Sequence, residues 1–193
     1  MTMKQAPILD KKQYKALLAA TKMTRHSDRN RLAVVLSFGA GLRAMEIAAI
    51  TVADVIDANG DVKEQAFLKK HQVKGNKSGT IYLSDGVRAE IKNYAQKHSY
   101  ILACPSQALL QSQKGGGFNS KTIQHLFKRL FKSIGMNDCS SHSGRRSLLT
   151  SLNDNGVNIR TIQAIARHSH LNTTARYLSV TDTQIKNAVN LVF

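Results

Sequence analysis

The chain has 193 residues, of which 42% are hydrophobic, so it is long enough to bury a substantial core and its composition argues against disorder. It contains 28 Lys and Arg against 12 Asp and Glu, a net charge of +16 that is spread along the whole sequence. Such an excess on a folded domain favours a polyanionic partner, most commonly nucleic acid, although charge alone also fits a merely basic soluble protein.

Targeting and membrane segments are not visible in the sequence. Residues 1–6 lead into polar sequence without the apolar segment of a signal peptide. No stretch approaches the roughly 18 consecutive apolar residues of a membrane span. The two cysteines, Cys104 and Cys139, give no sign of a disulfide framework. We therefore expect a soluble, cytoplasmic protein with no membrane partner.

The N-terminal part of the chain is predicted to be helical. Asp10 is a candidate N-cap for the first helix. A second helix is expected over about 28–38, where apolar residues recur at helical spacing. It stops at the Gly-Ala-Gly of residues 39–41, because glycine accommodates the backbone of a helix end. A short helix then covers residues 43–50.

The middle of the chain is predicted to form a small antiparallel sheet of three strands. Asn59-Gly60 is a hairpin signal between a strand over 52–56 and the segment that follows the turn. A second turn, Gly-Asn-Lys-Ser-Gly at 75–79, precedes a strand over 80–83.

The C-terminal half is predicted to be all helical. One helix begins at Ser84 or Asp85 and another is capped by Ser120. The glycine-rich stretch at 113–117 is too short for a domain linker. The remaining helices are expected at about 142–155, 158–167, 172–179 and 182–191. The predicted fold class is therefore α+β, mainly helical, in a single domain over residues 1–193.

Residues that carry chemistry are concentrated in the last third of the chain. His142 and Arg145 are three residues apart and share one face of a helix, and helix N-termini bind phosphate well. His168 and Tyr177, nine residues apart, add a phosphate-polarising group and a phenolic nucleophile. Together they suit the attack of a tyrosine on a phosphodiester. Taken singly, each also fits a plain structural role as a cap, a solvated charge or a core aromatic residue.

Arg43 and Glu46 lie one helical turn apart. As an exposed ion pair they contribute only about 0.2–0.5 kcal/mol. Alternatively, Glu46 holds a guanidinium whose fork grips two phosphate oxygens. Lys74 and Lys77 flank the tip of the second hairpin. Lysines in turns are usually only solvated, but a hairpin can also carry a general acid into a groove.

A metal site is the weaker alternative. Cys139, His142, His168 and His170 together offer four possible zinc ligands. Their spacing fits no common zinc pattern, and the chain has no second pair of cysteines. We expect no metal and no cofactor.

Taken in order, these motifs resemble the tyrosine recombinase (phage integrase) family over nearly the whole chain, from about residue 9 to about residue 188. The resemblance is carried by Gly41-Leu42-Arg43-x-x-Glu46, Val73-Lys74-Gly75-Asn76-Lys77, His142-x-x-Arg145, Asn155-Gly156 before Ile162-Gln163, and His168-Ser169-x-Leu171-x-Thr173-Thr174-x-x-Tyr177. By matching position, it implies the active-site residues Arg43, Lys74, His142, Arg145, His168 and Tyr177.

The chain departs from the family pattern at several points. The family usually has Leu-Gly before the second histidine, whereas this chain has Ala166-Arg167. Ser143-Gly144 replaces the bulkier pair that is common between the first histidine and its arginine. The segment between the first arginine and the lysine is somewhat long, which keeps Lys77 as an alternative general acid.

The N-terminus is a larger departure. Members of this family typically place a separate helical DNA-binding domain before the catalytic one. Only 42 residues precede Arg43, too few for that domain. The resemblance therefore implies either an excised catalytic domain or a natural single-domain member, as in the small fimbrial phase-variation invertases.

The function implied by the resemblance is a site-specific recombinase that cleaves and rejoins double-stranded DNA through a 3′-phosphotyrosyl intermediate. Tyr177 would attack the scissile phosphate, and Arg43 and Arg145 would grip its non-bridging oxygens. His168 would donate a further hydrogen bond to the phosphate. The first histidine would assist deprotonation of the phenol, and Lys74 would protonate the departing 5′ oxygen.

The resemblance also implies a homotetramer on DNA, in which the helix over 182–191 docks on a neighbouring protomer; in a free monomer this helix packs on its own domain. Two other functions remain open from the sequence. A type IB topoisomerase uses similar chemistry but rejoins the same strand. A non-catalytic DNA-binding protein derived from a recombinase would keep the basic surface without turnover.

Overall fold

The computed structural model describes residues 5–73, 78–113, 116–178, 180 and 182–190. The α-helices of this part of the chain are α1 (Lys11–Lys22), α2 (Ser27–Gly39), α3 (Ala44–Ala49), α4 (Val52–Val55), α5 (Asp85–Lys97), α6 (Ser120–Ser133), α7 (Ser143–Asp154), α8 (Ile159–Ala166), α9 (Leu171–Ala175) and α10 (Asp182–Val189). The strands are β1 (Gln65–Leu68) and β2 (Gly79–Tyr82), and the short 3₁₀ helices are η1 (Lys70–Gln72) and η2 (Ser99–Ala103).

Side-chain caps set the beginnings of two long helices. At α1, the Asp10 carboxylate accepts a hydrogen bond from the Gln13 N–H at 2.7 Å, and the Gln13 side chain accepts one from the Asp10 N–H at 3.0 Å. This reciprocal capping box satisfies two N–H groups that the helix leaves without partners. At α6 the cap is Asn119, which accepts from the Thr122 N–H at 2.8 Å, so the predicted cap at Ser120 is one residue too late.

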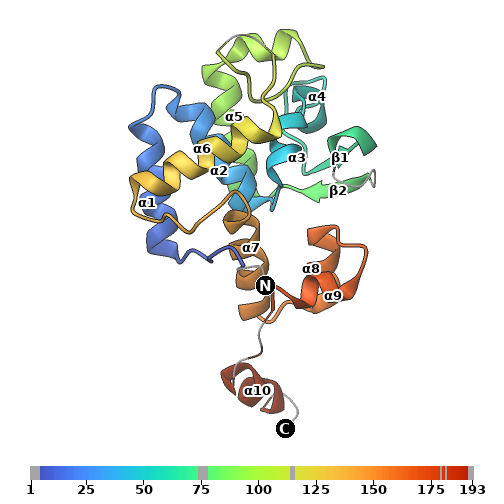
Figure 1. Ribbon diagram of the computed structural model, residues 1–193. Coiled ribbons are helices and arrows are strands. Elements are labelled where there is room, and N and C mark those ends of the chain that lie inside the picture. Colours follow the sequence, from blue (N-terminus) through green and yellow to red (C-terminus); the bar gives the residue numbers. More distant parts are fainter. Residues whose placement is uncertain (1–4, 74–77, 114–115, 179, 181, 191–193) are drawn as a thin grey trace.

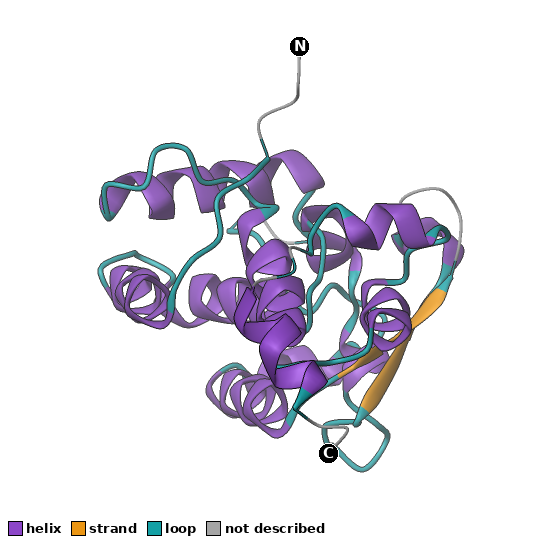
Figure 2. Cartoon of the chain, turned by 90° about the horizontal axis from the view of Figure 1, so that it is seen from below, coloured by secondary structure: helices purple, strands orange, loops and turns teal. Residues whose placement is uncertain are grey.

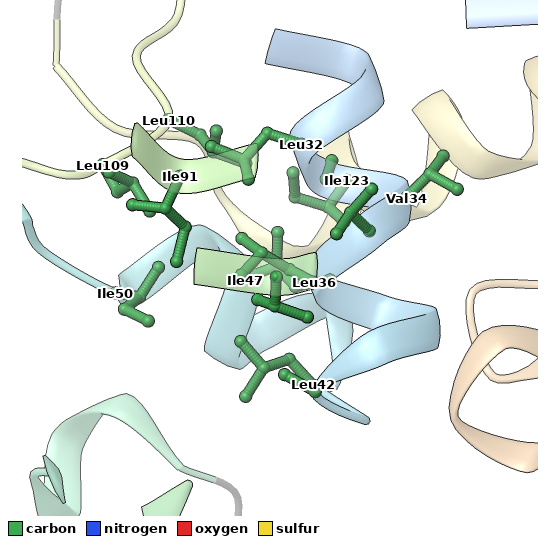
Figure 3. Close-up of a cluster of buried hydrophobic side chains, with 14 of the residues drawn as sticks. Leu32, Val34, Leu36, Leu42, Ile47, Ile50, Ile91, Leu109, Leu110 and Ile123 are labelled. Carbon is green, nitrogen blue, oxygen red and sulfur yellow. The ribbon is translucent and has the colours of Figure 1, made fainter. Parts of the chain in front are cut away.

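Helices α1 to α6 and the sheet share one hydrophobic core, and we call this part of the molecule the main body. Helix α2 forms its centre. Its residues from Leu32 to Ser37 are buried without interruption, as expected for a helix that is surrounded by protein on all sides. It packs against α1, α3, α5, α6 and α7. Figure 3 shows Leu36 of α2 together with Ile47 of α3 and Ile91 of α5 in this core. The core therefore fixes the position of α3, whose first residues adjoin Arg43.

The sheet has two strands, not the predicted three. β1 and β2 pair antiparallel, with Gln65 opposite Tyr82 and Leu68 opposite Gly79. They lie at one edge of the helical body (Figure 2). Lys74 and Lys77, in the connection between the strands, lie outside the described residues.

Residues 52–56, predicted as the third strand, form α4 instead. The Thr51 N–H donates to the Asp54 carboxylate at 2.8 Å, and the Asp54 N–H donates to the Thr51 hydroxyl at 3.3 Å. This capping box stabilises a helical turn at a sequence whose valines favour a strand. Gln72 adds a 2.6 Å hydrogen bond to the buried Asp54. The predicted turn at residues 59–60 does form, and a single antiparallel bridge joins the residues on either side of it.

Helix α7 connects the main body to a smaller group formed by α8 and α9 (Figure 1). This group has a separate hydrophobic cluster, which we call the small cluster: Leu149 of α7 with Ile162 and Ala166 of α8. Tyr177 packs against the small cluster. The main body and the nucleophile candidate thus belong to different apolar cores, with α7 between them.

One prediction for the C-terminal helices needs correction. α9 ends at Ala175, so Tyr177 lies in the turn after the helix and not within it. The Tyr177 N–H donates to the Thr174 carbonyl at 2.9 Å, and the Thr150 hydroxyl donates to the Tyr177 carbonyl at 3.2 Å. These bonds replace the helical pattern. The last helix, α10, lies away from the rest of the molecule (Figure 1).

No helix in the described part of the chain is both long enough and apolar enough to cross a bilayer.

Candidate active site

Arg145 is the centre of the candidate site. It is buried in the first turn of α7. Its Nη1 donates to the carbonyl oxygen of Gly41 at 2.6 Å, and its Nη2 donates to the carbonyl oxygen of Ala166. These two carbonyls belong to the segment before α3 and to the last turn of α8. One guanidinium therefore joins the main body to the α8–α9 group.

The Gly41 carbonyl reaches Arg145 because the chain turns sharply there. Gly41 has a φ of +63°, a conformation that residues with a Cβ atom rarely adopt. A Cβ atom at this position would also lie 3.1 Å from a methyl group of Leu148 on α7. Glycine is thus favoured by the backbone conformation, and a Cβ atom here would also press on α7.

His168 links Arg145 to Tyr177. Its Nε2 lies 3.1 Å from Arg145 Nη2, and its Nδ1 lies 3.0 Å from the hydroxyl oxygen of the buried Thr174. A guanidinium only donates hydrogen bonds, so Nε2 accepts and the ring proton is on Nδ1, which donates to Thr174. The imidazole stacks on the Tyr177 ring, with the ring centroids 5.5 Å apart and the planes at 24°. Guanidinium, imidazole and phenol therefore form a continuous series of contacts.

The electrostatics of the site keep this imidazole neutral. Burial, followed by the positive charges of Arg145, Arg43 and Arg167, lowers the pKa of His168 to about 4. The protonated ring is disfavoured because it would add a further cation to a partly desolvated group of cations. At pH 7 the ring is an acceptor towards Arg145.

The same crowding acts on the buried arginine. Burial first, and then Arg43 and Arg167, lower the pKa of Arg145 to about 9, while Glu46 and Tyr177 oppose this effect. Arg145 remains a cation at neutral pH. Its Nε is buried and has no hydrogen-bond partner among the described residues. Because the atom is buried, the surrounding side chains would have to move before it could donate to an anion.

Glu46 is the carboxylate of the site, and two arginines share it. The side chain of Glu46 is fully buried, its Oε1 lies 2.9 Å from Arg43 Nη1, and its Oε2 also accepts the Arg43 N–H at 2.9 Å. Arg167 Nη2 lies 2.6 Å from the same Oε2. The predicted hold of Glu46 on Arg43 is present in the structure. With three guanidiniums, one carboxylate and a neutral imidazole, the site carries an excess of positive charge.

His142 and the two lysines are placed less directly. His142 occupies the residue before α7, is exposed, and makes no capping hydrogen bond with its side chain. It lies at the same end of α7 as Arg145. Lys74 and Lys77 lie outside the described residues. The structure therefore brings together Arg43, Arg145, His168 and Tyr177 from the predicted set.

Sequence reasoning missed the part played by Arg167, which entered only as a departure from the family pattern. The available signal was that an arginine stands where the family usually has glycine. No signal in the sequence marked the two carbonyls that accept from Arg145, because every residue has a carbonyl. Among the described residues, no group of three or more His, Cys, Asp or Glu side chains is placed to hold a metal ion.

Comparison with known proteins gives the family. A model described as "Phage integrase family" matches residues 7–184. A curated relative, the tyrosine recombinase XerC of Bifidobacterium longum, is 25% identical over 181 residues, which is 89% of this chain and 49% of the relative. The chain spans about half the length of the curated relatives it matches.

Solved structures show the same fold. The crystal structure of XerA recombinase superposes with a TM-score of 0.76 at 21% identity, covering 98% of this chain and 66% of that one. The XerH site-specific recombinase bound to its difH substrate gives a TM-score of 0.71 at 21% identity, covering 98% of this chain and 55% of that one. The mainly helical fold with its small sheet is that of a recombinase catalytic domain.

Proposed function

Because this chain belongs to the phage integrase family, we propose that it cleaves and rejoins double-stranded DNA as the catalytic domain of a site-specific recombinase, with Tyr177 as the nucleophile. The observation that carries the proposal is the contact series from Arg145 through His168 to Tyr177. Two further guanidiniums lie beside this series. A phenol next to a cluster of cations suits an attack on a phosphodiester, whose charge grows in the transition state.

The proposed reaction replaces one phosphoester bond by another. The Tyr177 oxygen attacks the scissile phosphorus, the bond from phosphorus to the 5′ oxygen breaks, and the phosphate stays on Tyr177 through its 3′ side. The tyrosine proton is lost, and the 5′ oxygen takes up a proton as it leaves. The phosphotyrosyl bond retains the energy of the broken one, so a 5′ hydroxyl of another strand reverses the step without ATP.

Two arginines are proposed to bind the non-bridging oxygens. Arg145 lies in hydrogen-bond contact with His168, and Arg43 is 27% exposed, held by Glu46 and open towards solvent. Since Glu46 holds the Arg43 guanidinium before DNA arrives, little reorganisation of this group is needed in the transition state. Glu46 balances part of the charge while the site is empty.

His168 is proposed to change its hydrogen bonding when DNA binds. In the structure its Nε2 accepts from Arg145. A bound phosphate would draw that guanidinium to its own oxygens and would offset the cations that hold the pKa of His168 low. The imidazole is then able to carry a proton on Nε2 and to donate it in a hydrogen bond to the phosphate.

The remaining proton transfers are assigned to a histidine and a lysine outside the contact series. The Tyr177 phenol has to lose its proton as it attacks, and His142 at the start of α7 is the proposed base. Lys74 is the proposed general acid for the 5′ oxygen, with Lys77 as the alternative. Both lysines lie outside the described residues.

Double-stranded DNA and further copies of the chain are the proposed partners. The net charge of +16 supports the DNA partner, and a related recombinase, XerH, has been crystallised on its difH substrate. α10 lies away from the main body and exposes Ile185 and Val189, which supports docking on a neighbour in a homotetramer. The single-domain organisation and the cytoplasmic location remain predictions.

Covalent capture tests the proposed function. The protein is incubated with a labelled pool of random-sequence duplexes that carry a nick, so that the cleaved strand loses its short 5′ fragment and cannot be rejoined. A protein–DNA adduct that survives denaturation is expected for the wild type and is expected to be absent for Tyr177→Phe. Tyr100→Phe, an exposed tyrosine of η2, is the matched control and should form the adduct.

An adduct that persists in Tyr177→Phe would assign the nucleophile elsewhere, and a wild type that forms no adduct but binds the pool would indicate a non-catalytic DNA-binding protein. A supercoiled plasmid that carries two copies of the captured site separates the remaining alternative. Exchange between the sites is expected, whereas relaxation without exchange would indicate a type IB topoisomerase.

A further inference from the structure

Arg167 occupies a backbone position that favours glycine. It follows the last residue of α8 with a φ of +52°, and among the residues that the structure describes it is the one non-glycine residue with a positive φ. Glycine is the usual residue in this left-handed conformation at a helix end. An arginine in this conformation is less stable than a glycine would be. Contacts of its side chain can offset that cost in free energy.

The side chain of Arg167 reaches the carboxylate that holds Arg43. Its Nη2 lies 2.6 Å from Glu46 Oε2, and the side chain is only 11% exposed. Glu46 is fully buried and binds Arg43 through its other oxygen at 2.9 Å. A buried carboxylate between two guanidiniums has a fixed orientation, because each charged hydrogen bond restricts its rotation. Arg167 therefore helps to fix where Arg43 points.

The aliphatic part of Arg167 lies against the sheet. A Cβ atom added to Gly79, the first residue of β2, would be 2.9 Å from Arg167 Cδ and 3.4 Å from its Cγ. The arginine is thus enclosed between β2 on one side and Glu46 on the other. It leads directly into His168, the ring that stacks on Tyr177.

We propose that Arg167 is a positioning residue for strand cleavage, which aligns Arg43 through Glu46 and joins the segment of His168 and Tyr177 to the main body. This inference rests on the proposed function, since it assumes that Arg43 binds the scissile phosphate. Arg167 does not contact DNA itself: its charged end is bonded to Glu46 and is nearly inaccessible. Its effect is expected on the cleavage step and not on binding.

Substitution of Arg167 tests the proposal on the adduct-forming reaction. Arg167→Ala and Arg167→Gly are expected to lower the single-turnover rate at saturating nicked duplex at least tenfold, while the Kd for the duplex changes less than about threefold. Arg31→Ala is the matched control, because Arg31 forms a 2.7 Å ion pair with Glu90 away from the site; its rate should stay within twofold of the wild type.

Two readouts separate positioning from general stabilisation. Arg167→Gly relieves the backbone at φ +52° and should melt at a higher temperature than Arg167→Ala, yet both should cleave slowly. Millimolar methylguanidinium should restore part of the rate of Arg167→Gly, whereas sodium chloride at the same ionic strength should not. The proposal would be overturned if Arg167→Gly cleaved at the wild-type rate. It would also be overturned if the cleavage rate followed the melting temperature across the variants.

A second variant makes the outcome independent of catalysis. Gly79→Ala should lower the melting temperature in the wild-type background, because the new Cβ displaces the Arg167 side chain, and should have no such effect in Arg167→Gly. Equal effects in both backgrounds would overturn the enclosure of Arg167. If this coupling is found but the wild type forms no adduct, the proposed function fails while the placement of Arg167 stands.

Discussion

The imidazole of His168 illustrates how a single residue is tuned by its neighbours. Burial and then three guanidiniums keep it neutral, and its two nitrogens are committed to Arg145 and Thr174. At neutral pH an anion next to the ring would favour its protonation, since a negative charge offsets the cations. The residue is therefore suited to respond to the phosphate that it is proposed to stabilise.

The low pKa of His168 makes stability depend on pH in a defined window. An unfolded histidine titrates near 6.5 and His168 in the folded chain at about 4, so between these values the unfolded state binds more protons. The free energy of unfolding should therefore fall as the pH is lowered from 6.5 to 4. Denaturant unfolding at several pH values should show a shallower fall for His168→Asn.

His125→Asn, at an exposed position of α6, is the control for that experiment and should keep the wild-type slope. A pH dependence that is the same in the wild type and in His168→Asn would show that the imidazole is not held neutral by the fold.

At the scale of elements, α7 determines the geometry of the site. It packs on α2 in the main body and on α8 in the smaller group, and Arg145 projects from its first turn. Gly144 makes the close approach to α2 possible: a Cβ atom there would lie 2.4 Å from Ser37 Oγ and 2.7 Å from Phe38 Cδ2. The small pair at residues 143–144, a departure from the family pattern, thus has a packing reason.

Gly144→Ala is predicted to separate α7 from α2. Because Ser37 is fully buried and has little room to move, the added methyl group should lower the free energy of unfolding by about 1–3 kcal/mol. The adduct-forming rate should fall as well, since Arg145 moves with α7. Gly86→Ala on α5 is the control, because a Cβ atom there meets nothing within 4 Å.

In urea titrations that control variant should be as stable as the wild type or slightly more stable, since alanine favours a helix over glycine. An unchanged midpoint for Gly144→Ala would mean that α7 does not pack against α2 this closely.

Much of the helical framework was predictable because its signals are local. Asp10 and the glycines at 39–41 marked helix ends that the structure contains. The strand expected at 52–56 was wrong, since the prediction rested on the hairpin signal at Asn59-Gly60, whereas the Thr51–Asp54 capping box favours a helix there. Short elements depend on such single hydrogen bonds, which composition does not reveal.

The site was predictable only as a set of residue types. The sequence placed His142 and Arg145 on one helix, and the pairing of Arg43 with Glu46 followed from their spacing. The bonds of Arg145 to two main-chain carbonyls span 104 and 21 residues and involve acceptors without side-chain identity. Contacts of this kind arise from the packing of α7 and leave no trace in a sequence pattern.

At the scale of the whole molecule, charge is the dominant property. A net charge of +16 on 193 residues should make duplex DNA binding strongly dependent on salt, because each phosphate contact releases a condensed counterion. For about six contacts, the affinity for random-sequence duplex should fall about 10³-fold between 50 and 200 mM salt. Fluorescence anisotropy titrations at four or more salt concentrations measure this slope.

Tyr177→Phe should give the same slope as the wild type in these titrations, since it removes no charge. An affinity that barely changes over this salt range would argue against a DNA-binding surface.

The small cluster of Leu149, Ile162 and Ala166 supports the Tyr177 ring and is separate from the core of the main body. The proposed DNA binding and the proposed strand cleavage should therefore be lost independently of each other. A variant in which the side chains of the small cluster are shortened is expected to lose cleavage and to keep the proposed binding of DNA. We expect such a variant to act as a dominant-negative competitor, because it would occupy a recombination site without cutting the strand.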